Sequence, residues 1–222
     1  MANLSFADIA IVSCGTLSME ISHLRAEGFL DTEHLFFTTP GLHEDIHELE
    51  RQLLDRINRA RQKADKVLVI YGGKFCYVNA DEPTHTMQQI IAEQGAGVAR
   101  IQATHCMDMI VSQTERETIA AEVADGEKVW WMIPGWIKFR HQVFKGWDQG
   151  LANENFPRHS GGAVVLDGIG YMDTYMADNP EAFLAYSDWM GIPIIPYSVT
   201  LDRFKSLLVD QAEKLHGNQV QG

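Results

Sequence analysis

The sequence predicts an α/β protein in which a mostly parallel sheet carries helices on both faces, a Rossmann-like three-layer architecture. Short apolar runs of strand character alternate with stretches of helical character about seven times along the chain. Several of these runs stop at a glycine or at a Pro-Gly pair, which are common ends of strands. No linker, low-complexity segment or clear tandem repeat interrupts the pattern. We therefore expect residues 1–222 to form a single α/β domain, or two interlocked halves.

The first half of the chain contains four predicted strands and four predicted helices. The strands are apolar runs at residues 8–13, 34–38, 66–71 and 98–103. Helices are expected over residues 16–26, 44–64, 84–93 and 107–123. In the second of these helices Ile46, Leu49 and Leu53 share one face, which is typical of an amphipathic helix that packs on a sheet.

The second half repeats the alternation less regularly. Strands are predicted at residues 128–133, 163–167 and 192–197, and helices at 180–190 and 201–215. Pro193 and Pro196 favour an edge position for the last strand, because proline cannot donate a ladder hydrogen bond. Residues 139–160 are aromatic and polar with weak periodicity, which suggests an insertion or a lid. We expect the tail after Gly217 to be frayed.

Composition excludes several kinds of partner. The formal net charge is −12, so the surface repels phosphate backbones and anionic lipid, and we expect neither nucleic acid nor membrane as a partner. No apolar stretch approaches the roughly 18 residues that a membrane span needs. The first residues lack the basic region and cleavage site of a signal peptide, so we expect a cytoplasmic protein. A small-molecule substrate is expected, and a homo-oligomer remains open.

The three cysteines are the strongest functional signal. Cys14, Cys76 and Cys106 each follow a predicted strand, and the carboxyl ends of parallel strands meet at one edge of a sheet, where ligands bind. An odd number of cysteines in a reducing compartment is a poor basis for structural disulfides. Three thiolates from three loops suit a soft metal, either an iron–sulfur cluster (4Fe-4S) or zinc, with one coordination position left open. The alternatives are a single reactive cysteine and inert burial as small apolar side chains.

Other polar and aromatic side chains are predicted at the same edge. The candidate catalytic residues are His43, His105, Asp167 and Tyr171, and Trp136 is a candidate for binding the cofactor. Packing, helix capping and solvated loops are the ordinary alternatives for each of them taken alone. Because His105 directly precedes Cys106, joint binding of one metal would need an unusual backbone, so His105 is expected to hydrogen-bond substrate or a cysteine sulfur instead.

One segment matches the H-E-x-x-H zinc-protease motif, from His43 to His47. Three features count against that interpretation. The match lies just after Pro40-Gly41 rather than inside a helix. Asp45 is charged at a position where a buried zinc-binding helix usually has an uncharged residue. The parallel α/β pattern also does not fit that enzyme class.

Two glycine-rich segments are weak phosphate-binding candidates. Gly72-Gly73-Lys74 lacks the spacer and the hydroxyl residue of a Walker motif. Residues 168–170 lack both the third glycine of a dinucleotide fingerprint and the helix start that should follow it. We expect a polar pocket wall there.

Together these motifs resemble an uncharacterised bacterial and archaeal domain-of-unknown-function family. The resemblance covers about residues 8–208 and rests on Cys14-Gly15, Leu42-His43, Tyr71-Gly72-Gly73 with Cys76, Thr104-His105-Cys106, and Pro134-Gly135-Trp136. This chain departs from the family pattern twice: two residues separate Gly73 from Cys76, and His105 directly adjoins Cys106. The resemblance implies a genomic context of corrinoid-dependent methyl-transfer systems in anaerobes.

Three functions remain open from the sequence. The first is a metal-dependent lyase or transferase with an iron–sulfur cluster in anaerobic one-carbon metabolism, in which one iron is free to bind substrate. The second is a zinc-thiolate methyltransferase. The third is a non-enzymatic accessory partner of a corrinoid protein.

Overall fold

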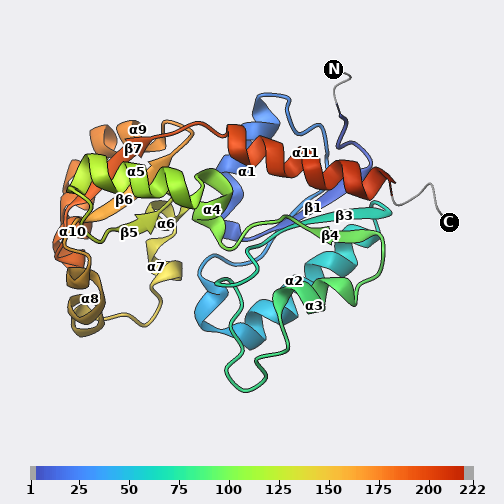
Figure 1. The fold of residues 1–222 in the computed structure, drawn as a ribbon, viewed down its shortest axis with the longest axis horizontal. Coiled ribbons are helices and arrows are strands. Elements are labelled where there is room, and N and C mark those ends of the chain that lie inside the picture. Colours follow the sequence, from blue (N-terminus) through green and yellow to red (C-terminus); the bar gives the residue numbers. More distant parts are fainter. Residues whose placement is uncertain (1–3, 218–222) are drawn as a thin grey trace.

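Two parallel sheets with helices packed on them form the protein, so the predicted fold class is confirmed. A computed structural model describes residues 4–217, and the tail after Gly217 lies outside this part of the chain. Four strands pair in the order β2-β1-β3-β4 and three more in the order β5-β6-β7 (Figure 1). Every pairing is parallel. We call the part built on the four-stranded sheet the first lobe and the part built on the three-stranded sheet the second lobe.

The first lobe follows the order of the chain. Its elements are β1 (Ile9–Ser13), η1 (Gly15–Leu17), α1 (Ser18–Ala26), β2 (Leu35–Phe37), η2 (Leu42–Glu44), α2 (Ile46–Arg61), β3 (Lys66–Ile70), α3 (Met87–Ala92), β4 (Val98–Arg100) and α4 (Cys106–Ile110).

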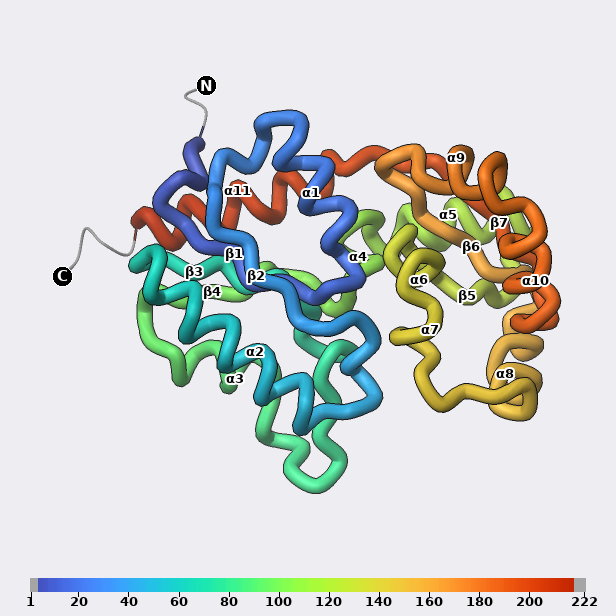
Figure 2. Tube along the Cα trace, turned by 180° about the vertical axis from the view of Figure 1, so that it is seen from behind, coloured from blue at the N-terminus to red at the C-terminus, as the bar shows by residue number. Residues whose placement is uncertain are grey.

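The second lobe follows, and the last helix returns to the first. The elements are α5 (Gln113–Ala124), β5 (Trp130–Met132), α6 (Pro134–Lys138), α7 (Arg140–Val143), α8 (Gln149–Asn155), η3 (Phe156–Arg158), β6 (Ala163–Asp167), α9 (Tyr171–Asp178), α10 (Pro180–Met190), β7 (Ile194–Ser198) and α11 (Asp202–Gly217). Figure 2 shows α11 running back across the first lobe, so both ends of the described chain lie there.

The alternation of side chains along the strands builds three layers in the first lobe. Val12 and Val69 point to the face that α2 and α3 cover. Ile11 and Ile70 point to the opposite face, where α1 and α11 pack. Both faces of β1 and β3 are buried, which explains why these strands are continuous apolar runs in the sequence.

The second lobe repeats the scheme on a smaller scale. Met132 and Val165 face a cluster that includes residues of α6, α7, α8 and α10. Val164 and Leu166 face the other side, in the cluster that also contains Ile119 of α5. The last strand, β7, pairs with β6 alone and is an edge strand, as its two prolines predicted. Residues 139–160 fold into α7, α8 and η3.

Several predicted boundaries were wrong for identifiable local reasons. The single helix expected over 107–123 is broken before Ser112, which caps a new helix together with Glu115 in a capping box. The helix start judged absent after residues 168–170 is present, because α9 begins at Tyr171. The short helices α6, α7 and α8 were not predicted, since turns of four to seven residues leave little periodic signal.

The topology determines where a ligand can bind. The chain passes from β1 to β2 on one side and then returns to β3 on the other side of β1, so β1 and β3 flank the switch point of the sheet. A crevice opens at such a point beyond the carboxyl ends of the strands. No helix within residues 4–217 is long and apolar enough to cross a membrane.

Candidate functional site

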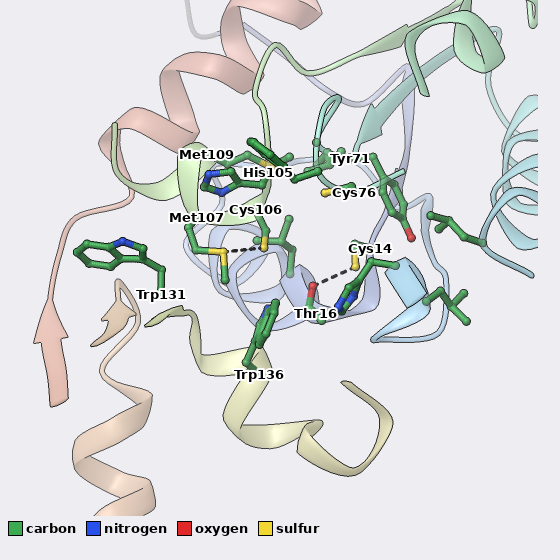
Figure 3. Close-up of a pocket in the computed structure, with 17 residues that line it drawn as sticks. Cys14, Thr16, Tyr71, Cys76, His105, Cys106, Met107, Met109, Trp131 and Trp136 are labelled. Atoms are coloured by element: carbon green, nitrogen blue, oxygen red, sulfur yellow. Dashed lines mark hydrogen bonds between the residues drawn. The ribbon is translucent and has the colours of Figure 1, made fainter. Parts of the chain in front are cut away.

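A cavity of about 290 Å³ lies at the switch point and contains all three cysteines (Figure 3). Its lining includes six of the eight predicted site residues, namely Cys14, His43, Cys76, His105, Cys106 and Trp136. Most of the remaining lining is apolar, with leucine, isoleucine, methionine and aromatic side chains. All three cysteines therefore line one cavity.

Each cysteine reaches the cavity from a different loop of the first lobe. Cys14 directly follows β1, Cys76 lies in the long loop after β3, and Cys106 is the first residue of α4. Trp131 and Trp136 come from the second lobe. The cavity thus lies between the lobes, with the thiols on one side and indole rings on the other (Figure 3).

Two arginines hold the cysteine-bearing loops in place. The buried guanidinium of Arg100 donates to the carbonyl oxygens of Tyr71 and Ala103, both at 3.0 Å, and so ties the loop after β3 to the loop after β4. From α11, Arg203 donates to the backbone oxygen of Asp108 at 2.7 Å and to its carboxylate at 3.1 Å. The sheet and the last helix therefore both anchor the chain around Cys106.

Gly72 permits the close approach of two loops. A β-carbon at this position would lie 2.5 Å from the α-carbon of His105 and 2.6 Å from the sulfur of Cys76. No real β-carbon tolerates such contacts without movement of its neighbours. The absence of a side chain at Gly72 is therefore what lets Cys76 lie beside the segment that carries Cys106.

The thiols themselves have weak protein partners. Cys14 shares a hydrogen bond of 3.0 Å with the hydroxyl of Thr16, and Cys106 donates to the thioether of Met107 at 3.2 Å. Burial raises the pKa of Cys14, raises that of Cys76 to about 12, and raises that of Cys106 well above its ordinary range. The neighbouring thiols raise the pKa of Cys76 and Cys106 further.

These raised pKa values bear on one of the sequence alternatives. A nucleophilic cysteine needs a thiolate, and catalytic sites obtain it by lowering the thiol pKa with nearby positive charge. Here the pKa of each thiol moves the other way. The protein alone therefore keeps the three cysteines neutral, which does not favour a single reactive cysteine.

His43 and Trp136 form one wall of the cavity. Their rings are stacked, with centroids 5.7 Å apart and planes inclined by 23°. Burial lowers the pKa of His43, so its imidazole is neutral near pH 7. The indole N–H of Trp136 is buried and has no hydrogen-bond partner within the described residues. The indole donor and the imidazole of His43, which is also exposed to solvent, thus line the same cavity.

His105 has a structural role that the sequence did not reveal. Its Nδ1 accepts a hydrogen bond of 3.2 Å from the backbone N–H of Asp108 and so caps α4. Because Nδ1 is an acceptor, the proton of the neutral ring is on Nε2. Burial, with a contribution from Arg116, lowers the pKa of His105. The ring therefore enters the cavity lining as a neutral N–H donor.

Two other predicted site residues lie outside this lining. The carboxylate of Asp167 accepts hydrogen bonds from the backbone N–H groups of Ile169, Tyr171 and Met172, at 3.0, 3.2 and 2.7 Å, and holds the start of α9. Tyr171 stacks on Tyr175 and lines a separate, shallower pocket beside α1. The structure does not bring either residue to the cysteines.

The H-E-x-x-H match does not form a zinc-protease helix. His43 belongs to η2 and His47 to α2, and Asp45 stands between them as the N-cap of α2 with a non-helical backbone. The two histidines therefore do not share one continuous helical face. This agrees with the expectation that the match is a coincidence.

The three cysteines share a cavity without forming a ready metal-binding group. Within residues 4–217, no group of three or more histidine, cysteine, aspartate or glutamate side chains is arranged to hold a metal ion as placed. A single zinc ion needs every sulfur at about 2.3 Å from one centre. The arrangement therefore does not match a preformed mononuclear site.

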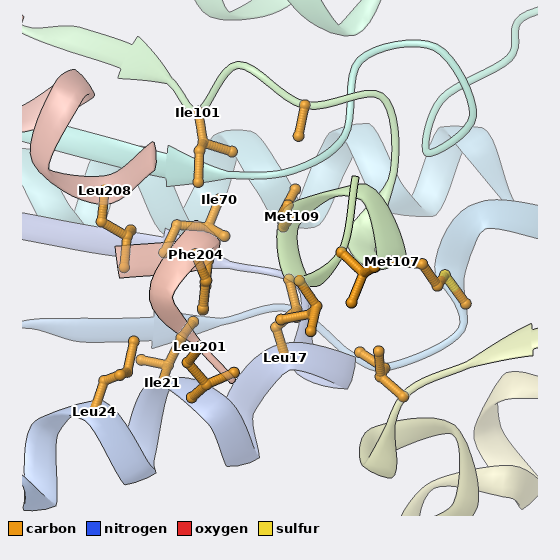
Figure 4. Packing of buried hydrophobic residues seen from close by; sticks show 14 of the residues in the cluster. Leu17, Ile21, Leu24, Ile70, Ile101, Met107, Met109, Leu201, Phe204 and Leu208 are labelled. Carbon is orange, nitrogen blue, oxygen red and sulfur yellow. The ribbon is translucent and has the colours of Figure 1, made fainter. Parts of the chain in front are cut away.

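Sequence reasoning missed the residues that shape the cavity. Thr16 bonds Cys14, Met107 accepts from Cys106, and Leu17 and Met109 form part of the lining. Leu17, Met107 and Met109 also belong to the hydrophobic cluster that packs α1 and α11 on the first sheet and extends into the second lobe, so the cavity lies directly against that cluster (Figure 4). Thr16 and Leu17 closely follow Cys14 in the sequence, and Met107 and Met109 closely follow Cys106. This nearness is the one feature of the sequence that could have predicted their place in the lining.

Comparison with known protein families assigns the chain to one of them. A family model described as a protein of unknown function (DUF1638) matches residues 37–208. The chain belongs to this family. Cys76 and Cys106 lie inside the matched segment, whereas Cys14 precedes it. No curated protein and no solved structure matches the chain.

Proposed function

We propose that the protein holds an iron–sulfur cluster through Cys14, Cys76 and Cys106 and binds a small substrate at the cluster. The observation that carries this proposal is the shared cavity. Three thiols from three loops at a sheet switch point line one space with mostly apolar walls. Soft thiolate ligands suit iron–sulfur clusters, and the chain has no fourth cysteine, so one iron would be free of protein sulfur.

The dispersed sequence positions of the three cysteines favour a cluster over a single zinc ion, because zinc sites usually include a local pair of ligands. Cluster ligands bind different iron atoms, so the thiols need to surround a volume rather than meet at one point. The described side chains include no ready mononuclear site.

A cluster with a free iron would supply Lewis-acid polarisation of a substrate oxygen. The chain's own groups would do the rest. His43, neutral and stacked on Trp136, is available to accept a proton. His105 presents an N–H donor, because its Nδ1 is engaged in capping α4. The apolar lining would exclude water from the bound substrate. This arrangement fits a lyase or a transferase. As its metabolic setting we propose corrinoid-dependent methyl transfer.

Single cysteine substitutions test this proposal. We expect protein purified without oxygen to be brown and to lose its visible absorption on reduction with dithionite. Cys14→Ser, Cys76→Ser and Cys106→Ser should each retain less than about a fifth of the iron of the unaltered protein, because a cluster with two thiolates is poorly held.

The matched control is Met109→Leu, a volume-conserving change in the same lining that removes a thioether but no thiol. It should keep the iron and the colour. Retention of full iron by any of the three serine variants would remove that cysteine from the proposal. A colourless protein with one tightly bound zinc would replace the cluster by the zinc-thiolate alternative.

A further inference from the structure

A second pocket, separate from the cysteines, combines positive charge with aromatic walls. It has a volume of about 450 Å³, within the range of small-molecule sites, and lies in the second lobe between α7, the loop after it and α10. Arg140, His141 and Lys145 line it, and its lining contains no acidic residue. In a chain of net charge −12, such a gathering of basic groups is unexpected.

In the described part of the chain no ion pair neutralises the basic groups, although Glu44, Asp45 and Glu48 line an adjoining pocket together with His141 and Lys145. Within residues 4–217, none of Arg140, His141 and Lys145 forms an ion pair. Arg140 lies over the ring of Tyr186, 5.3 Å from its centroid, and donates to the hydroxyl of Tyr175 at 3.0 Å. A guanidinium held in place by an aromatic face is oriented before any ligand arrives.

The aromatic walls pack against one another. Tyr186 stacks on Trp189, with centroids 5.8 Å apart and planes inclined by 27°. Phe144 contacts Trp147 and Trp189, with centroids 5.3 and 5.4 Å away. Flat faces of this kind bind planar rings and lose little side-chain entropy in doing so.

The hydroxyl of Tyr186 is the second observation that points to a ligand. The side chain is 3 % exposed and lines the pocket, yet its hydroxyl has no hydrogen-bond partner in the described part of the protein. An unsatisfied buried hydroxyl costs about 1–3 kcal/mol unless something else bonds it. Because the hydroxyl has almost no accessible surface, a bound molecule would supply that bond once a neighbouring aromatic side chain moves aside.

We propose that this pocket binds a small planar aromatic molecule that carries an anionic group. The ring packs against Trp147 and Trp189, the anion lies beside His141 and Lys145, and a polar atom bonds the hydroxyl of Tyr186. The site goes beyond the proposed function, because none of its groups is a cysteine or touches the thiols. Glu44 lines an adjoining pocket with His141 and Lys145, and its carboxylate accepts from the indole of Trp147 at 2.9 Å.

Naphthalene-1-sulfonate is a suitable probe, with 1-naphthalenemethanol as its neutral counterpart, and titration calorimetry at low ionic strength measures both. The sulfonate should bind the full chain at least about tenfold more tightly than the neutral ring, the effect of one charge-assisted contact. Lys145→Gln and Tyr186→Phe should each weaken sulfonate binding by about three- to tenfold. Glu44→Gln, which keeps the acceptor for Trp147, should strengthen it.

The control Lys63→Gln removes the same charge from an exposed position at the end of α2 and should leave binding unchanged. Replacement of all three cysteines by serine should also leave it unchanged, which separates this site from the cluster. The proposal is overturned if the sulfonate does not bind, if both naphthalene compounds bind equally, or if Lys63→Gln weakens binding as much as Lys145→Gln does.

Discussion

The backbone of Gly135 lies directly against the carbonyl oxygen of Thr16, so closely that a β-carbon at position 135 would come within 1.8 Å of that oxygen. This contact joins α6 of the second lobe to η1 of the first. Trp136 follows Gly135 in α6, and Cys14 lies two residues before Thr16. The contact therefore brings Trp136 and Cys14 to the lining of one cavity. The distance between the lobes at the candidate site is therefore set by a glycine.

Gly135→Ala should destabilise the protein although the residue lies in a helix. In an open helical position this change stabilises by up to about 1 kcal/mol. Here the methyl group must push η1 and α6 apart, an overpacking that costs about 1–3 kcal/mol. Urea denaturation measures the free energy of unfolding. The control is Gly217→Ala in α11, where nothing lies within 4 Å, and a similar loss of stability in both variants would contradict this account.

Gly72→Ala should damage the cysteine site more than it damages the fold. The added β-carbon meets the sulfur of Cys76 and the α-carbon of His105, so the loop after β3 has to shift. We expect at least about a tenfold loss of metal affinity, as for changes that displace a ligand's support. Circular dichroism should still report a folded protein. Full metal content in this variant would show that the spacing at Gly72 does not matter for the site.

Glu20→Gln should stabilise the protein, and more so at higher pH. Glu20 is 1 % exposed, its two oxygens have no hydrogen-bond partner in the described residues, and burial, aided by the charge of Asp167, raises its pKa from 4.5 to about 8. Between these values the folded chain keeps a proton that the unfolded chain loses, so the free energy of unfolding falls as pH rises. Glutamine removes this dependence.

The advantage of Glu20→Gln should therefore grow by up to about 1.4 kcal/mol for each pH unit between about 5 and 8. Below that window the difference in free energy of unfolding between the two proteins should no longer change with pH. Denaturation curves at pH 5 and pH 8 are sufficient for this comparison. An advantage that is equal at both pH values would mean that Glu20 does not hold a proton in the folded state.

Glu50 should control the mobility of the loop that carries Cys76. Its carboxylate accepts a hydrogen bond of 2.6 Å from the hydroxyl of Tyr77 and lies 3.1 Å from Nε2 of His85, so it ties both arms of the loop to α2. Glu50→Ala removes both bonds. Hydrogen exchange of residues 72–86 should become about tenfold faster or more, while β1 and β3 exchange as before. Unchanged loop exchange would contradict the role of Glu50.

The sequence was informative where the fold repeats a simple period. β1 and β3 were predictable because both faces of each strand are buried, and the edge position of β7 was predictable from Pro193 and Pro196. The meeting of the cysteines followed from one rule, that parallel strands share a carboxyl edge.

What the sequence did not reveal depends on contacts between distant residues. Asp167 is a backbone cap rather than part of a pocket wall, because its carboxylate accepts from the N–H groups at the start of α9, whereas Ile169, Gly170 and Tyr171 do line a pocket. The division of the strands into two sheets and the close approach of Gly135 to Thr16 arise only when the lobes pack. No local pattern encodes such contacts.

The most direct test of the central claim is a count of iron, acid-labile sulfide and zinc in protein purified without oxygen. The account predicts about four iron atoms and about four sulfides for each chain, with little zinc, and loss of both iron and sulfide when Cys14, Cys76 and Cys106 are all replaced by serine. A colourless protein that holds one zinc, or an iron content that the triple variant retains, would contradict it.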